Sequence, residues 1–131
     1  MDHGQDLLRD FENCALPAEA FHHRGHIRVA WTYLRRMDYS SAVERMSEAI
    51  RKYAEFHGAN SKYHHTLTLA WMRLVAAAMR LDPGIDDFDL FAGMHSELLD
   101  PSAPKEFYSL ELLQSEAART GWVEPDLRTL P

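Results

Sequence analysis

The chain has 131 residues, is 46% hydrophobic and carries a formal net charge of −6. This length and composition predict one soluble globular domain over residues 1–131. Because the charge is negative and no basic run is present, nucleic acid and anionic membrane surfaces are poor candidates for partners. No apolar run reaches the roughly 18 residues of a membrane span, and the first ten residues do not have the pattern of a secretory leader. Cys14 is the only cysteine, so we expect no internal disulfide and a cytoplasmic location.

Apolar residues recur at helical spacing in three segments of the first half of the chain. The first segment covers residues 4–14 and the second covers residues 18–37. The third begins at Ser41, which forms a predicted capping box with Glu44. Gly58 is expected to end this helix at the C′ position.

The strongest helical pattern covers residues 61–81, which are apolar on nearly every side. A helix with two apolar stripes has neighbours on most of its surface, so we expect it to be the central helix of a bundle. His64 falls in its first turn, on the inward side. Trp31 and Trp71 are both expected to be largely buried.

The C-terminal half contains a turn at Asp82-Pro83-Gly84, a helix started by Asp86 and Asp89, and a last helix over about 105–119. The tail from Gly121 cannot be helical around Pro125, so we expect it to lie along the bundle in extended form. No segment alternates with a period of two. The predicted fold class is therefore all-α, a single-domain bundle of five or six helices around residues 61–81.

Five of the eight histidines lie in two short clusters, at residues 22–26 and 64–65. Residues three apart on a helix lie roughly 5–6 Å from each other, so His23 and His26 can share one ion. His64 would complete a site of three imidazoles, a ligand set that suits a divalent metal such as zinc or iron. Glu19, one turn before His23, is a candidate ligand or general base, provided that the helix begins before Phe21.

Two alternatives use the same three histidines. In the first they belong to a metal-free polar pocket, and in the second they are purely structural, capping helices or bonding backbone carbonyls. Gly25, inside the helical pattern, indicates either close approach of a backbone or ligand, or a frayed surface turn. The three histidines outside the clusters are expected to face solvent: His3, His57 and His95.

Four motifs resemble a group of short, all-helical bacterial proteins that have no assigned reaction. They are F-x-H-x-x-H-I-x-x-A-W at residues 21–31, K-Y-H-x-T-L-T at residues 62–68, Y-S-x-x-L-L-x-S-x-x-A-R at residues 108–119, and the W-V-x-P-D that follows. The resemblance includes His23, His26 and His64 and implies that Arg119 and Ser109 belong to the same neighbourhood.

Two function classes follow. The first is a metal-dependent enzyme acting on a small polar or anionic molecule, with Glu19 and Arg119 as catalytic candidates. The alternative is a non-catalytic ligand-binding or interaction module with a metal-free buried polar network. We also expect a homodimer, because Phe88, Phe91 and the apolar tail offer surface for a twofold partner.

Overall fold

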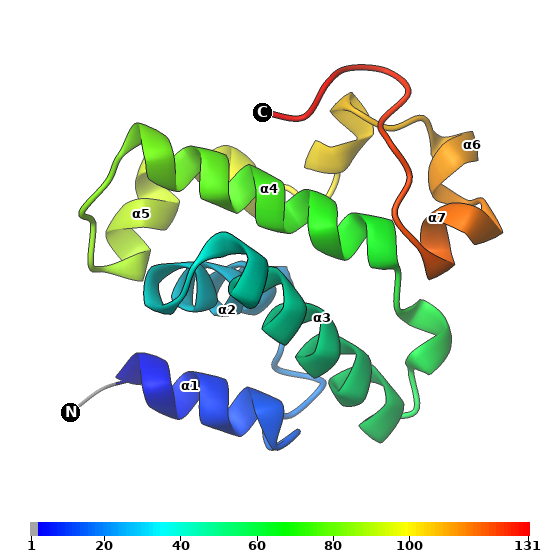
Figure 1. The fold of residues 1–131 in the computed structure, drawn as a ribbon. Coiled ribbons are helices and arrows are strands. Elements are labelled where there is room, and N and C mark those ends of the chain that lie inside the picture. The colour runs from blue at the N-terminus through cyan, green and yellow to red at the C-terminus, as the bar shows by residue number, and fades with distance from the viewer. Residues whose placement is uncertain (1–2) are drawn as a thin grey trace. The chain divides into compact units, whose positions relative to one another are not determined.

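The computed structural model describes residues 3–131, and this range contains seven α-helices, three short 3-10 helices and no strand. The predicted all-α fold class is confirmed. None of these helices combines the length and the apolar character that a membrane crossing requires. Contacts divide the chain into two compact units, Met1–Tyr63 and His64–Pro131. The elements, shown in Figure 1, are α1 (His3–Glu12), α2 (His23–Arg36), α3 (Tyr39–Phe56), η1 (Asn60–Lys62), α4 (His65–Leu81), α5 (Phe88–Met94), η2 (Ser96–Leu99), η3 (Ala103–Glu106), α6 (Leu110–Leu113) and α7 (Glu116–Thr120).

The first unit is a three-helix assembly in which α1, α2 and α3 contact one another (Figure 1). Its core includes Phe11 of α1, Tyr33 of α2 and Tyr53 of α3, all less than a tenth exposed. Glu12 ties the three helices together. Its Oε2 accepts hydrogen bonds from Tyr33 Oη at 2.6 Å and from Arg45 at 2.7 Å. Burial and this carboxylate both raise the pKa of Tyr33 above its ordinary value.

Two helices of this unit end in the same way. Gly58 has a φ of 70° after α3, and Cys14 has a φ of 59° after α1. At both ends the backbone N–H of the following residue donates to the carbonyl oxygen five residues earlier, with Ala59 N to Ala54 O at 2.7 Å and Ala15 N to Asp10 O at 2.8 Å. These are Schellman motifs, which satisfy the last carbonyls of a helix. The prediction for Gly58 is confirmed, whereas the left-handed backbone of Cys14 was not foreseen.

The start of α3 was predicted wrongly. The N-cap is Asp38, whose carboxylate accepts a hydrogen bond from Ser41 N at 2.8 Å, so Ser41 lies inside the helix. Asp and Ser are both good capping residues, and the sequence alone did not rank the two.

The second unit is built on α4, which contacts α7 and η3. Thr66, Ala70 and Met72 of α4 are fully buried, and they point in different directions around the helix. Trp31, in the first unit, is buried as predicted, but Trp71 is only half-buried. Leu81, at the end of the predicted stripe, is 76% exposed.

The helix expected over 105–119 is instead three short elements, η3, α6 and α7. Ser109 and Ser115 interrupt it, because each hydroxyl accepts a hydrogen bond from a backbone N–H three residues later. A serine at such a position starts a new helix more readily than it continues an old one. The tail after α7 is non-helical, as predicted.

The preceding helix is also divided, into α5 and η2, and its N-cap is Asp87 rather than Asp86 or Asp89. Phe88 and Phe91 are 6% and 1% exposed. They therefore belong to the core. Neither side chain is available as the contact surface of the predicted homodimer.

Candidate functional site

His23 and His26 begin α2, three residues apart on one helix as the sequence predicted. His22 is the N-cap, although its side chain makes no capping hydrogen bond. Because the helix begins at His23, Glu19 lies outside it, and the placement of Glu19 one helical turn before His23 is wrong. The backbone reverses between Pro17 and Phe21, where Phe21 N donates to Pro17 O at 3.0 Å.

His26 is packed against an aromatic ring. Phe21 stacks on the imidazole with ring centroids 4.2 Å apart and an interplanar angle of 25°. Gly25 makes this stack possible, since a Cβ at this position would lie 2.9 Å from Cδ1 of Phe21. A side chain at residue 25 would therefore collide with the Phe21 ring. The interpretations from the sequence were a nearby backbone or ligand and a frayed turn, and neither included this contact.

The imidazole of His26 is neutral at pH 7. Burial, and after it the nearby His23 ring, lowers the pKa of His26 to about 4, against a smaller opposing effect of a hydrogen bond to the Phe21 backbone. A half-buried ring without a carboxylate partner is easier to keep uncharged. A neutral imidazole is able to bind a metal, but it packs equally well as an aromatic side chain.

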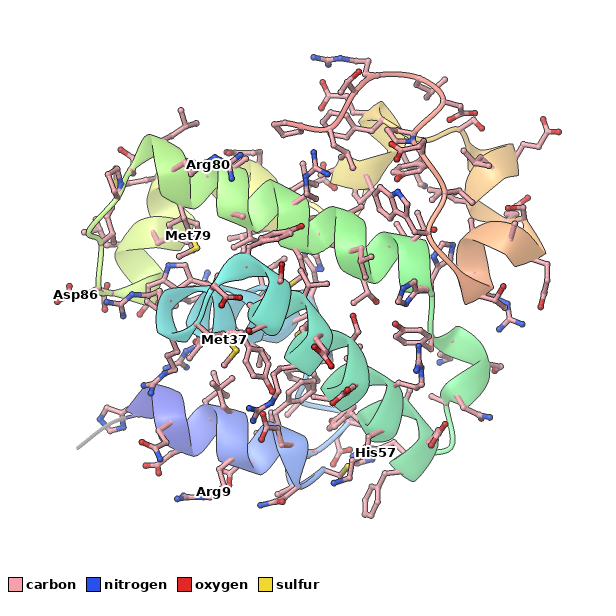
Figure 2. The ribbon with its side chains drawn as sticks, in the orientation of Figure 1. Arg9, Met37, His57, Met79, Arg80 and Asp86 are labelled. Atoms are coloured by element: carbon pink, nitrogen blue, oxygen red, sulfur yellow. The ribbon has the colours of Figure 1, made fainter. Side chains whose placement is uncertain are left out.

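The stack continues into an aromatic cluster that was not predicted. Phe21 lies 5.1 Å from Tyr53 and 5.3 Å from Phe11, measured between ring centroids. Tyr53 in turn lies 4.3 Å from the ring of His57. His57, which Figure 2 labels at the end of α3, is half-buried and not solvent-facing, contrary to the prediction. Its Nε2 is buried and has no hydrogen-bond partner among the residues described.

His64, the first residue of the second unit, is held in a different way. It is the N-cap of α4, and its Nδ1 accepts a hydrogen bond from Leu67 N at 3.1 Å. Its Nε2 lies 2.7 Å from the carbonyl oxygen of Leu113. Since an N–H must donate to Nδ1 and a carbonyl can only accept, the ring is the neutral tautomer with its hydrogen on Nε2. Both nitrogens are engaged, and a metal on His64 would have to displace one of these bonds.

Thr66 forms the next layer of this network. It is fully buried, its Oγ1 donates to the carbonyl oxygen of Gly121 at 2.6 Å, and it accepts from Val123 N at 3.2 Å. A hydrogen bond to the carbonyl four residues earlier, which is common for threonine in a helix, is made instead by Thr68, whose Oγ1 donates to His64 O at 2.9 Å. Thr66 thus secures the start of the tail to α4.

Two more side chains fasten the tail to the same unit. Tyr108 Oη donates to Val123 O at 2.8 Å, and burial raises the pKa of Tyr108 to about 12. Ser109 donates through its N and Oγ to Asp126 at 2.8 and 2.6 Å. These two bonds hold the pKa of Asp126 below its usual value.

Arg119, the candidate anion-binding residue, lies on α7. Its guanidinium is 3.4 Å from Oε1 of Glu116, one turn earlier on the same helix, and its side chain is 42% exposed. Such an exposed pair contributes little to stability. Arg119 is therefore a surface residue whose guanidinium is in contact with the carboxylate of Glu116.

His95, like His57, was wrongly predicted to face solvent. It is 6% exposed, with Nε2 2.6 Å from Oδ2 of Asp82 and Nδ1 3.4 Å from Oε1 of Glu97. His95 follows Phe91 by four residues, as His57 follows Tyr53. Each imidazole therefore extends a buried stripe by one turn, a spacing that predicts inward placement.

No group of three or more His, Cys, Asp or Glu side chains in residues 3–131 is arranged so that it could hold a metal ion. His23 and His26 belong to the first unit and His64 to the second, so their convergence on one ion stays a prediction. Cys14 is buried, as expected of a small apolar side chain, with Sγ 3.9 Å from Lys52 O.

Comparison of the chain with protein-family models, with curated proteins and with solved structures finds no match.

Proposed function

We propose that this protein is a non-catalytic binding module in which the inward histidines belong to a metal-free polar and aromatic framework. The observation that supports this best is the pair of hydrogen bonds at His64, one to each ring nitrogen. A ligand imidazole needs a free lone pair, and the only lone pair of this tautomer already accepts from Leu67 N.

The other candidate groups support the same proposal. His26 is stacked on Phe21, and Arg119 is paired with Glu116. Thr66, Tyr108 and Ser109 direct their hydroxyl groups to the tail. Groups that satisfy one another in this way stiffen a scaffold.

A metal-dependent enzyme acting on a small polar or anionic molecule remains the second candidate. The low pKa of His26 favours it, because a neutral imidazole is ready to bind zinc or iron. In that proposal His23, His26 and His64 are the ligands and Arg119 holds the anion. A cytoplasmic location and a homodimer are part of both proposals.

Elemental analysis of untagged protein separates the two candidates. We expect less than about 0.1 atom of zinc or iron per chain, and an unfolding midpoint that EDTA leaves within about 1 °C, since a ligand that is not bound cannot stabilise the native state. One tightly bound metal per chain that is lost in His23→Ala and kept in His22→Ala would overturn the binding-module proposal.

A further inference from the structure

The net charge of this protein is concentrated in one segment. Residues 81–100 contain six carboxylates and no Lys or Arg, whereas the other 111 residues hold fourteen acidic and fourteen basic side chains. All but one of the six carboxylates belong to exposed residues, and the exception, Asp82, is half-buried beside His95. Figure 2 shows Asp86 on the segment that joins α4 to α5. The excess of negative charge therefore surrounds α5.

The outer face of α5 is apolar. Its inner face buries Phe88, Phe91 and Ala92, whereas Leu90 and Met94 are 56% and 47% exposed. These two residues are four apart, so they lie on the same side of the helix. Gly93 lies beside them, and a Cβ added to it would meet no atom within 4 Å. Leu90, Met94 and the open space beside Gly93 form one exposed surface, which we call the α5 face.

We propose that the α5 face binds a cationic amphipathic helix of a partner protein, an inference that rests on the proposed function as a binding module. The apolar residues of the partner would cover Leu90 and Met94, while its Lys and Arg side chains would lie near Asp86 at one end and Glu97 at the other. Met adapts to differently shaped apolar partners. The local negative charge speeds encounter with a basic segment and disfavours acidic ones.

The same charge excludes other partners for this face. Nucleic acid and anionic lipid would be repelled by five exposed acidic residues close to two apolar side chains. A patch of this size supports a weak, reversible complex, whose affinity falls as salt screens the charges.

The probe is a synthetic peptide of about 18 residues, five helical turns, with leucines at i, i+3, i+4 spacing and lysines on the flanks. A matched peptide carries glutamate in place of every lysine. We expect the lysine peptide to bind with micromolar affinity by fluorescence anisotropy, about 10-fold more weakly in 300 mM than in 50 mM salt, and the glutamate peptide not to bind.

Gly93 offers a matched pair of variants, because the space beside it is open and its backbone is ordinary helix. Gly93→Lys places a cation on the α5 face and should weaken binding of the lysine peptide about 10-fold, whereas Gly93→Ala should change it less than about 2-fold. Leu90→Ser with Met94→Ser should also weaken binding, unlike Leu110→Ser, which alters a side chain 57% exposed on α6.

Three results would overturn the proposal: equal binding of the two peptides, equal effects of Gly93→Lys and Gly93→Ala, or a homodimer abolished by Leu90→Ser with Met94→Ser, which would make a second copy the occupant. Failure of the peptide to bind leaves the metal analysis untouched. A stoichiometric metal, in turn, contradicts the proposed function whatever the peptide does.

Discussion

His26 in the first unit and His64 in the second were predicted to share one role, yet they are held by different forces. His26 stacks on Phe21 within an aromatic cluster, and its ring is neutral because it is buried. His64 is fixed by two hydrogen bonds, to Leu67 N and to Leu113 O. An inward histidine can thus be held either by packing or by hydrogen bonds, and its position in the helical pattern does not distinguish the two. The substitutions below change either the packing around His26 or the hydrogen bonds of His64.

Phe11→Ala should have the largest effect, because it removes a fully buried ring that lies 5.3 Å from Phe21 and 5.5 Å from Tyr53. We expect a loss of about 3–5 kcal/mol of unfolding free energy by chemical denaturation. Phe56→Ala is the matched control, since Phe56 is 69% exposed, and it should cost less than about 0.5 kcal/mol. Similar costs for both would mean that the aromatic cluster does not stabilise the first unit.

Acid should destabilise the protein through His26. The folded pKa of about 4 lies below the unfolded value of 6.5, so the unfolded chain takes up its proton first. The stabilising effect of the neutral ring is complete above pH 6.5 and is lost as the pH falls towards 4, a change on the order of 3 kcal/mol. Denaturation at several pH values measures this slope.

His26→Gln should flatten that slope, and His22→Gln should change it only slightly, because His22 is exposed and is the smallest of the causes that lower the pKa of His26. A slope that persists in His26→Gln would assign the pH dependence to another group.

His64→Ala should cost about 2 kcal/mol, because it removes a helix cap and leaves the Leu113 carbonyl unpaired. His22→Ala is a close control, since His22 is also an N-cap but makes no side-chain capping bond. It should stay within about 0.5 kcal/mol of the wild type. His64→Asn, which can cap but is too short to replace the whole imidazole, should recover about half of the loss. If the two alanine variants are equal, the hydrogen bonds of His64 are not stabilising.

The smallest effect concerns the stack itself. Gly25→Ala forces the Phe21 ring to shift, so we expect a net loss of about 1 kcal/mol despite the better helix propensity of alanine. Gly93→Ala meets no atom within 4 Å and should gain about 0.5–1 kcal/mol. Thermal unfolding of the two variants compares them directly, and a stabilised Gly25→Ala would show that the Phe21–His26 stack yields at no cost.

The sequence by itself determined the all-α class, the end of α3 at Gly58, the turn at Pro83-Gly84 and the non-helical tail. These features follow from periodicity, a left-handed glycine or a proline, all of which act over a few neighbouring residues. His57 and His95 were wrongly predicted to face solvent, although each follows a buried aromatic residue by four, a local spacing that favours an inward position.

Only the tertiary structure decided what the histidines contact. Leu113 is 49 residues from His64, and Gly121 is 55 residues from Thr66. No local pattern encodes such pairs, because they depend on how the whole chain closes. Local capping choices were equally undecided where candidates compete, as at Asp38 and Ser41 or at Ser109 within a predicted helix. The free energies of alternative caps differ by only about 1 kcal/mol, so the packing of neighbouring residues is enough to decide which cap forms.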